Sequence, residues 1–316
     1  MPIDLRSLRY FNVMATTGSI SRAAEALHIA QPALSHHLKM MESELNAKLL
    51  ERTTRGVIPT PAGLKFLAHS RDILERIQAA QEDVRGGASE PMGTVSVGMP
   101  QSIGLALAPR LVPEVVERWP KLRLQIIEVA TGHMLDQLNS RAIDLGITFL
   151  RDKATGLRYQ SLVDEELVLV SPPGVSKPFP ADMLQKAGKM ELKQLEKVRL
   201  VLPSPRQSLR QLIDRYARQA RVKLNVIADV DSIPQLTALV AGGIGHTILS
   251  FPSVVDALMQ GKLSVARITN PTVLRTVFLC RPGNLAASSN IAAIEARIIE
   301  TVDTLVRQGS WPGRTT

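Results

Sequence analysis

The hydrophobic pattern of the chain changes its period once, and this change limits the folds that the chain can adopt. Between residues 5 and 85, apolar residues recur three and four positions apart, which is typical of amphipathic helices. After the glycine-rich segment Gly86–Gly93, short apolar runs alternate with helical stretches. This order predicts a helical N-terminal part and, beyond a flexible linker, an α/β part built from strand–helix–strand units.

Three short helices are predicted at the start of the chain. The first covers Leu5–Thr16 and ends at Gly18, because glycine readily adopts the left-handed conformation that terminates helices. The second covers Arg22–Leu27, and Ser19 or Ser21 can cap it. A tight connection leads to the third helix, and this spacing is typical of a helix-turn-helix.

The third helix begins near Pro32, whose missing N–H costs nothing in a first helical turn. Its apolar side chains fall on one face, which we expect to be buried. That stripe consists of Leu34, Leu38, Met41 and Leu45. The opposite face carries short polar and cationic groups and is therefore the candidate contact surface.

A short basic segment, Arg52–Thr60, is punctuated by glycine and proline and predicts a two-stranded wing. Thr60 can cap a long helix that opens at Pro61 and extends to about Arg85. A seam with spacings of three and four runs along this helix, through Gly63, Phe66, Ser70, Ile73, Ile77, Ala80 and Val84. The seam suits pairing with a second copy of the chain, and the alternative is packing against its own N-terminal domain.

Beyond the linker, two sets of strands and helices are predicted. The first set has strands at Thr94–Met99, Leu122–Val129 and Asp144–Phe149 and helices at Ile103–Val116 and His133–Asn139. The second has strands at Leu167–Val170, Val198–Leu202, Leu224–Val230 and Thr247–Leu249 and helices at Gln207–Ala220 and Ile233–Ala241. A last strand and helix, at Thr276–Cys280 and Ile291–Val306, return to the first set. This alternation predicts parallel sheets with helices on both faces.

The predicted domains are a winged helix-turn-helix at residues 1–60, a linker helix and hinge at 61–92, and a two-lobed α/β domain at 93–316. Lobe one takes residues from about 93–162 and 269–316, and lobe two takes 163–268. Strands that cross between the lobes leave a cleft between them. The fold class is therefore α/β, preceded by a helical domain.

The net charge of +9 indicates a polyanionic partner, but the charge is unevenly distributed. Residues 1–92 contain 11 lysines and arginines against 10 acidic residues, whereas residues 93–316 contain 27 against 19. Bulk charge therefore does not single out the helix-turn-helix, and the local arrangement of side chains has to identify the contact surface.

The exposed face of the third helix carries groups that read base edges in the major groove of double-stranded DNA. Gln31 can bond an adenine edge in two places, and cations beside the helix can neutralise phosphates. The candidate DNA-binding residues are Ser21, Gln31, Pro32, Ser35, His36, Lys39, Arg52 and Arg55. The alternative is an ordinary solvated helix face.

Several other classes of protein are disfavoured. The single cysteine, Cys280, sits in an apolar run, so we expect a buried side chain and a reducing compartment rather than disulfides. No apolar run is long enough to span a bilayer, and the polar residues Met1–Asn12 favour a segment that is not a secretory signal, so we expect a cytoplasmic protein without a membrane partner. His36 and His37 point about 100° apart on a helix, so we expect no metal site there. No cofactor is expected either.

The segment Gly18–Gly63 resembles the LysR-type transcriptional regulator family. The resemblance rests on an alanine pair in the second helix, the sequence QPALS opening the third, the turn LLERT and a wing that ends T-P-A-G. It extends over nearly the whole chain, including Pro109, Asp144–Ile147 and Gly243–Gly245. Within the family, the segments Thr131–Leu135, Leu202–Pro205 and Gly245–Leu249 resemble the nitrogen-assimilation regulators.

This resemblance implies a homotetramer, a dimer of dimers, that binds an imperfect inverted repeat in DNA. It also implies a small-molecule effector domain similar to type 2 periplasmic binding proteins. By position, Gln31, Pro32, Ser35 and His36 would meet base edges, and Arg55 would serve the wing. Two positions depart from the family pattern, since many members have Ser in place of Ala30 and Arg in place of His36.

The effector cleft is expected at the carboxyl ends of strands, facing helix N-termini. The candidate effector-binding residues are Gln101, Ser102, Thr131, Phe149, Ser204 and Thr247. Hydroxyls and helix N-terminal amides suit a small carboxylate or another anion. The alternative for Ser102 and Ser204 is a helix-capping role, and Pro100 stands where many members carry a serine.

An enzyme is the less favoured class. The segment Gly242–Gly245 follows a helix and precedes a strand, which is the reverse of the order in phosphate-binding loops. No catalytic motif of a hydrolase, metalloprotease or nucleotide-binding enzyme occurs. The sequence thus predicts a DNA-binding regulator, and the alternative is a small-molecule sensor or carrier that does not bind DNA.

Overall fold

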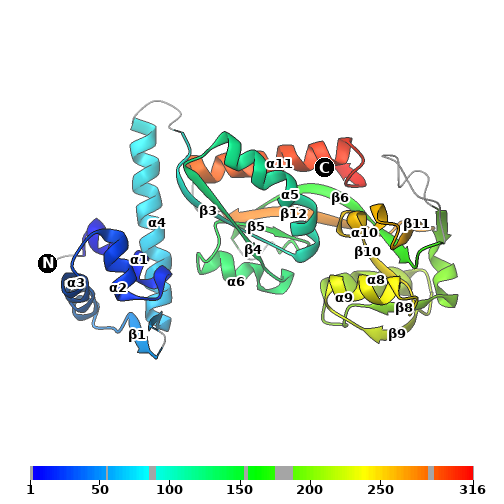
Figure 1. Cartoon of the computed structure of the whole chain (residues 1–316), viewed down its shortest axis with the longest axis horizontal. Coiled ribbons are helices and arrows are strands. Elements are labelled where there is room, and N and C mark those ends of the chain that lie inside the picture. The colour runs from blue at the N-terminus through cyan, green and yellow to red at the C-terminus, as the bar shows by residue number, and fades with distance from the viewer. Residues whose placement is uncertain are drawn as a thin grey trace.

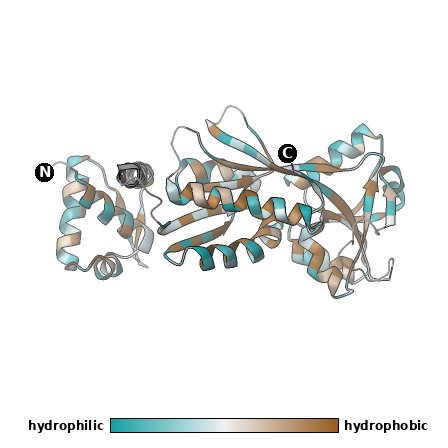
Figure 2. Ribbon diagram, turned by 90° about the horizontal axis from the view of Figure 1, so that it is seen from above, coloured by the Kyte–Doolittle hydropathy of each residue, from teal (hydrophilic) through white to brown (hydrophobic). Residues whose placement is uncertain are grey.

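The computed structural model describes residues 3–54, 56–84, 90–152, 156–174, 188–283 and 288–315. A helical N-terminal domain packs on the lower half of one long helix, and a two-lobed α/β domain follows (Figure 1). Seen from above, the long helix is viewed along its axis, between the N-terminal domain and the first lobe (Figure 2). The change of hydrophobic period in the sequence therefore coincides with a change of domain.

Three short helices begin the chain, and local caps bound the first two of them. The three helices are α1 (Leu5–Thr17), α2 (Ile20–Leu27) and α3 (Gln31–Glu44). Gly18 ends α1 with a φ of 63°, and the side chain of Ser19, not that of Ser21, caps α2 by accepting from the N–H of Arg22. The predicted stripe of α3 is buried at Leu34, Leu38 and Met41, but Leu45 is 38% exposed. Leu45 lies beyond the last turn of α3, so it no longer follows the helical period.

The wing is a hairpin of β1 (Leu50–Thr53) and β2 (Gly56–Pro59), paired antiparallel. It leads into α4, whose described part is Pro61–Val84, and the hydroxyl of Thr60 caps this helix by accepting from the N–H of Gly63 at 2.9 Å. A Cβ at Gly63 would lie 1.9 Å from the carbonyl oxygen of Leu49, so only glycine fits there. The predicted end of the helix at Arg85 lies outside the described residues.

The seam of α4 divides into two parts with different surroundings. Its first part faces its own chain, since Ser70 is fully buried and bonded to Asn12, and the ring of Phe66 lies 5.1 Å from that of Phe11. Further along, Ile73 is 41% exposed and Ala80 is exposed. Packing against its own chain therefore accounts for the first part of the seam, and pairing with a second copy stays a prediction for the exposed part.

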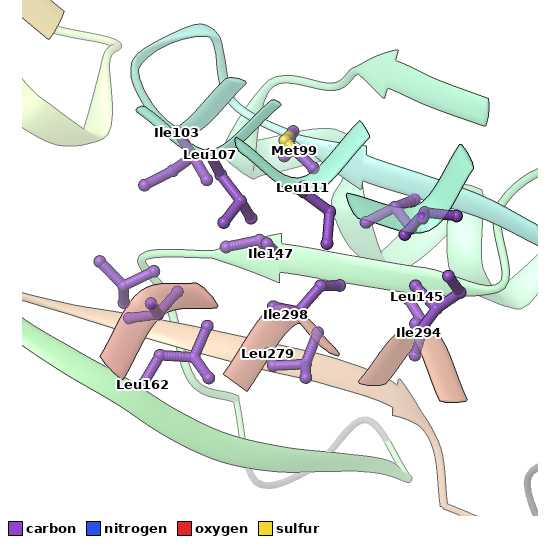
Figure 3. Packing of buried hydrophobic residues seen from close by; sticks show 14 of the residues in the cluster. Met99, Ile103, Leu107, Leu111, Leu145, Ile147, Leu162, Leu279, Ile294 and Ile298 are labelled. Carbon is purple, nitrogen blue, oxygen red and sulfur yellow. The ribbon is translucent and has the colours of Figure 1, made fainter. Parts of the chain in front are cut away.

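The first lobe is a sheet covered by helices. Its parallel strands are β3 (Gly93–Met99), β4 (Leu122–Glu128) and β5 (Leu145–Thr148), and its helices are α5 (Gln101–Arg118), α6 (Met134–Asn139) and α11 (Ser289–Arg307). Leucine and isoleucine side chains from α5, α11 and the strands meet in one hydrophobic core (Figure 3). The face of α5 that enters this core carries Ile103, Leu107, Leu111 and Val115. Val116 is 58% exposed because it lies one residue past Val115 and points about 100° away.

Two long strands connect the lobes. They are β6 (Leu157–Ser171) and β12 (Leu274–Pro282), which run antiparallel to each other. The first part of β6, up to Glu166, pairs with β12, and the part from Leu167 onward pairs with strands of the second lobe. The sequence predicts only Leu167–Val170 as strand here, because the polar first half of β6 lacks an apolar run. A short strand, β13 (Gly313–Thr315), also pairs with β6.

The second lobe contains the remaining elements. Its strands are β7 (Gly188–Glu191), β8 (Arg199–Leu202), β9 (Asn225–Asp229), β10 (Thr247–Ser250) and β11 (Ser264–Thr269), and its helices are α8 (Ser208–Gln219), α9 (Ile233–Ala241) and α10 (Val255–Met259). Strands β10 and β11 run antiparallel to β6, whereas β8 and β9 are parallel. The predicted parallel pairing is present in both lobes, at β3–β4, β3–β5 and β8–β9, but the connecting strands enter both lobes antiparallel to their neighbours.

Candidate functional site

Six of the eight predicted DNA-contact residues are exposed to solvent, and four of these lie on α3. Gln31, Pro32, His36 and Lys39 are exposed on α3, together with Ser21 on α2 and Arg52 on β1. Ser35 is half-buried, and Arg55 lies outside the described residues. Ala30 stands at the start of α3 and makes no side-chain cap bond, so the first N–H groups of the helix are not occupied by a cap.

The side chains of His37 and His36 have different surroundings, as expected for adjacent residues on a helix. The ring of His37 lies 5.0 Å from the ring of Tyr10 on α1, in an edge-to-face arrangement. His37 therefore helps to pack α3 on α1, and the exposed His36 stays with the contact surface. Within the described residues, no group of three or more His, Cys, Asp or Glu side chains is placed to hold a metal ion.

Glu42 is a functional candidate that the sequence reasoning missed. Its carboxylate, 8% exposed, accepts from the N–H groups of Leu49 and Leu50 at 2.9 and 3.3 Å and from Nζ of Lys48 at 2.7 Å. Burial raises the pKa of this carboxyl, but the three donors outweigh burial and hold the pKa below its usual value. Glu42 thereby fixes the wing relative to α3, and its place beside Met41 in the buried stripe was the available signal.

A cavity of about 190 Å³ lies between the two lobes. Four of the six predicted effector residues line it: Gln101, Ser102, Thr131 and Phe149. They follow β3, β4 and β5, so the prediction from strand ends is consistent with the cavity. The remaining lining residues include Gln207, Ser208, Asp231, Ile233, Ser250 and Arg275.

Three helices start at this cavity, and their N-termini favour negative charge in it. The residues before α5, α8 and α9 are Pro100, Gln207 and Ser232, and none of them makes a side-chain cap bond. The positive ends of three helix dipoles therefore face one small space. The side-chain oxygen of Gln101 accepts from the N–H of Ile233 at 3.4 Å, which links lobe one to the start of α9 in lobe two.

Arg275 is a second residue that the sequence reasoning missed. It is 6% exposed, and its Nε donates to Oε1 of the fully buried Glu165 at 2.7 Å. Its guanidinium also lies 3.6 Å from the ring centroid of Phe149, in a cation–π contact. Trp311 donates to the other oxygen of Glu165 at 2.9 Å. Alternation along β12 places Arg275 on the same face as Val277, and this spacing was the available signal.

The structure places Ser204 and Thr247 outside the cavity lining. The N–H and hydroxyl of Ser204 bond the carboxylate of Asp231 at 2.8 and 3.1 Å, and the N–H is the main cause that lowers the pKa of Asp231. Thr247 is fully buried within β10, opposite Val170 of β6. Ser250, at the other end of the same strand, does line the cavity and was missed.

A second, larger cavity of about 580 Å³ adjoins the first and shares Phe149, Ser208 and Arg275 with it. Arg215 and Arg218 of α8 border it and are exposed. The Phe149–Arg275 contact therefore forms a wall between a small inner cavity and a larger outer one. The inner cavity contains the helix N-termini, whereas the outer one is lined by the side of α8.

Cys280 is placed for packing rather than for thiol chemistry. It is 1% exposed, and its Sγ lies 3.2 Å from the carbonyl oxygen of Gly146. Burial raises the pKa of the Cys280 thiol to about 12, so the reactive thiolate is scarce.

Among the helices that the structure describes, none is long and apolar enough to span a membrane.

Comparison with known proteins agrees with the division into an N-terminal helix-turn-helix domain and a two-lobed α/β domain. Residues 5–64 match the family described as the bacterial regulatory helix-turn-helix protein, lysR family, and residues 88–302 match the LysR substrate binding domain. The nitrogen assimilation regulatory protein Nac of Escherichia coli (strain K12) is 29% identical over 312 residues, which are 97% of this chain and 97% of the relative. The regulator BbuR of Bordetella bronchiseptica is 26% identical over 315 residues, which are 100% of this chain and 95% of the relative.

Solved structures show the same fold. A full-length OxyR variant from Pseudomonas aeruginosa superimposes with a TM-score of 0.74 at 24% identity, over 95% of this chain and 97% of that one. An OxyR mutant from Corynebacterium glutamicum superimposes with a TM-score of 0.69 at 25% identity, over 98% and 96% of the two chains. Because the two family models together match most of its length, this chain belongs to the LysR family of bacterial transcription regulators, with a DNA-binding helix-turn-helix and an effector-binding domain.

Proposed function

We propose that α3 and the wing read a specific operator, and that an anion in the inner cavity modulates this binding. The observation that carries the first part is the exposed face of α3, where Gln31, His36 and Lys39 project from a helix that is packed on its other side. Gln31 and His36 then meet base edges, and Lys39 and Arg52 neutralise phosphates. Glu42 holds the wing in register with α3.

The anionic class of the effector follows from the inner cavity. Three helix N-termini meet there, beside the hydroxyls of Ser102 and Thr131. Those of α5 and α8 have no side-chain cap, and Gln101 accepts from the first N–H of α9. Carboxylate oxygens are good acceptors for such amides and hydroxyls. Because residues of both lobes line the cavity, a bound anion favours the closed arrangement of the lobes and shifts the conformational balance by that preference.

The active form in this proposal is a dimer of dimers in the cytoplasm, without catalytic activity. Support for pairing comes from the exposed part of the α4 seam at Ile73 and from the two-fold symmetry that inverted-repeat operators require. Support for a regulator rather than an enzyme comes from relatives that are transcriptional regulators. A sensor or carrier without DNA binding is the rejected alternative, since the helix-turn-helix is complete.

The test is a binding measurement with the full chain on operators found by genome-wide mapping. Gln31→Ala should lose roughly 1–3 kcal/mol of discrimination at one base pair. Arg52→Ala should weaken binding to all sequences alike and reduce the steepness of the salt dependence, because a phosphate contact releases counterions. Unchanged base preference in Gln31→Ala would remove that residue from the readout, and failure of the wild type to select any operator would overturn the proposal.

A further inference from the structure

Strand β10 contains two buried hydroxyls that have no hydrogen-bond partner in the described part of the chain. They belong to Thr247, which is fully buried, and Ser250, which is 2% exposed. A buried hydroxyl without a partner is unfavourable, so such groups are uncommon unless something else satisfies them. Each of the two therefore needs an explanation.

Only one of these hydroxyls is available to a ligand. Ser250 lines the inner cavity, whereas Thr247 does not. Positions three apart on a strand point to opposite faces of the sheet, which accounts for the difference. Ser250 is also the last residue of β10, where the strand reaches the cleft between the lobes. Its hydroxyl is thus left for whatever enters the cavity.

The other residues that line the inner cavity are a mixture of apolar, polar and charged side chains, with Glu128, Asp231 and Arg275 among the charged ones. The apolar ones include Val129, Leu209, Leu236 and Leu249. The volume of about 190 Å³ is below the range of about 300–1,000 Å³ that drug-sized ligands occupy. The occupant is therefore small, and it meets donors at the helix N-termini and the hydroxyl of Ser250, which has no partner within the described residues.

We propose that Ser250 determines effector specificity by hydrogen-bonding a second polar group of the ligand. The effector class is then a short carboxylic acid with a hydroxyl or keto substituent, rather than the unsubstituted acid. The carboxylate lies at the helix N-termini, and the substituent meets Ser250. This inference rests on the anionic effector proposed above. A site built to hydrogen-bond a substituent discriminates strongly against the analogue that lacks it, since the protein group is then left unpaired.

The experiment is calorimetric titration of the full chain with matched pairs of acids, propionate with lactate and succinate with malate. For at least one pair, the wild type should bind the hydroxylated member about tenfold or more tightly. Ser250→Ala should abolish that preference and leave the affinity for the unsubstituted member within about twofold. The melting temperature of Ser250→Ala should stay the same or rise, because no internal bond is lost.

Thr247→Val is the matched control. It deletes the other unpartnered hydroxyl of the same strand without changing the cavity lining, so both affinities and the preference should remain as in the wild type. An equal loss of affinity for both members in Ser250→Ala overturns the inference and leaves the anion site intact, as does a wild type without preference. Two further variants test the location. If Arg215→Ala abolishes binding and Ser102→Ala does not, the ligand occupies the outer cavity, and both the proposed site and this inference fail. Binding of no acid in the panel also overturns both.

Discussion

At the scale of single residues, Glu42 illustrates how one buried carboxylate organises a contact surface. It accepts two backbone N–H groups at the start of the wing while it belongs to α3. Hydrogen bonds to a charged group contribute more than neutral ones, roughly 1.5–3 kcal/mol each. The wing thus owes its position to the ionised form of Glu42, and this dependence can be measured.

Glu42→Gln should loosen the wing at about pH 7 and make little difference in acid. The folded chain lowers the pKa of Glu42 below its ordinary value of 4.5, so the stabilisation is present above that value and is lost as the pH falls through the folded pKa. Amide hydrogen exchange of residues 46–53 should be roughly tenfold faster in the variant at neutral pH. The exposed Glu25 supplies the control Glu25→Gln, and a difference that persisted undiminished in acid would assign the effect to shape rather than charge.

Cys280 gives a second prediction at this scale. Because burial raises its pKa to about 12, the folded chain should react with iodoacetamide at least about a hundredfold more slowly than a free thiol at about pH 8. Mass spectrometry of the alkylated chain measures this directly. Unfolding in guanidinium chloride should restore full reactivity, and rapid modification of the native chain would contradict the packed environment described for the thiol.

At the scale of elements, α4 has two functions along its length. Its first turns complete the core of the N-terminal domain through Phe66 and Ser70, and Gly63 allows the close approach of the wing. Further along, the same seam is exposed at Ile73. An apolar seam that repeats regularly along a helix therefore does not imply that one partner covers its whole length. The N-terminal domain covers the seam of α4 at Phe66 and Ser70 but not at Ile73.

Ile73→Asp combined with Ile77→Asp should separate the paired chains while the N-terminal domain stays folded, because buried carboxylates without partners are strongly unfavourable. Light scattering should show loss of half the mass of the basic assembly, and cooperative binding to two half-sites should disappear. Leu64→Asp is the control, since Leu64 is 51% exposed and lies on the opposite side of α4 from Ile73. Dissociation by Leu64→Asp alone would place the contact on that other face.

At the scale of the whole molecule, Arg71 links the domains. From α4 it donates to Oδ1 of Asn12 at 3.2 Å and to Oγ1 of Thr16 at 3.4 Å, both on α1. The same guanidinium donates to the carbonyl oxygen of Arg141, in the turn between α6 and β5 of the first lobe. One side chain of α4 thus bonds both the N-terminal domain and the effector domain. Movement of the first lobe would therefore act on α1 through Arg71.

Arg71→Ala should broaden the distribution of distances between α1 and α6 without unfolding either domain. Spin labels on one exposed cysteine introduced in each helix measure this, and the buried Cys280 should not interfere. Lys65→Ala, an exposed position on the same helix, serves as the reference. An unchanged distribution in Arg71→Ala would mean that other contacts suffice to hold the first lobe against α4.

Much of this architecture was determined by the sequence alone, because it depends on interactions within one helical turn or one strand. Gly18, Thr60 and the apolar stripe of α3 act locally, so the helix-turn-helix, the wing and the start of α4 could be derived from them. The cavity residues Gln101 and Thr131 follow from a general rule about strand ends, which also needs no knowledge of the partner strand.

The tertiary structure alone decided which strands run antiparallel, which part of the α4 seam is covered and which polar groups meet. Arg275 finds Glu165 110 positions earlier in the chain, and Arg71 meets Arg141 70 positions later. The directions of β6 and β12 bring the first pair together, and no local pattern encodes those directions. The role proposed for Ser250 also depends on the tertiary structure. Its unpaired hydroxyl becomes a candidate ligand contact only because residues of both lobes enclose a cavity beside it.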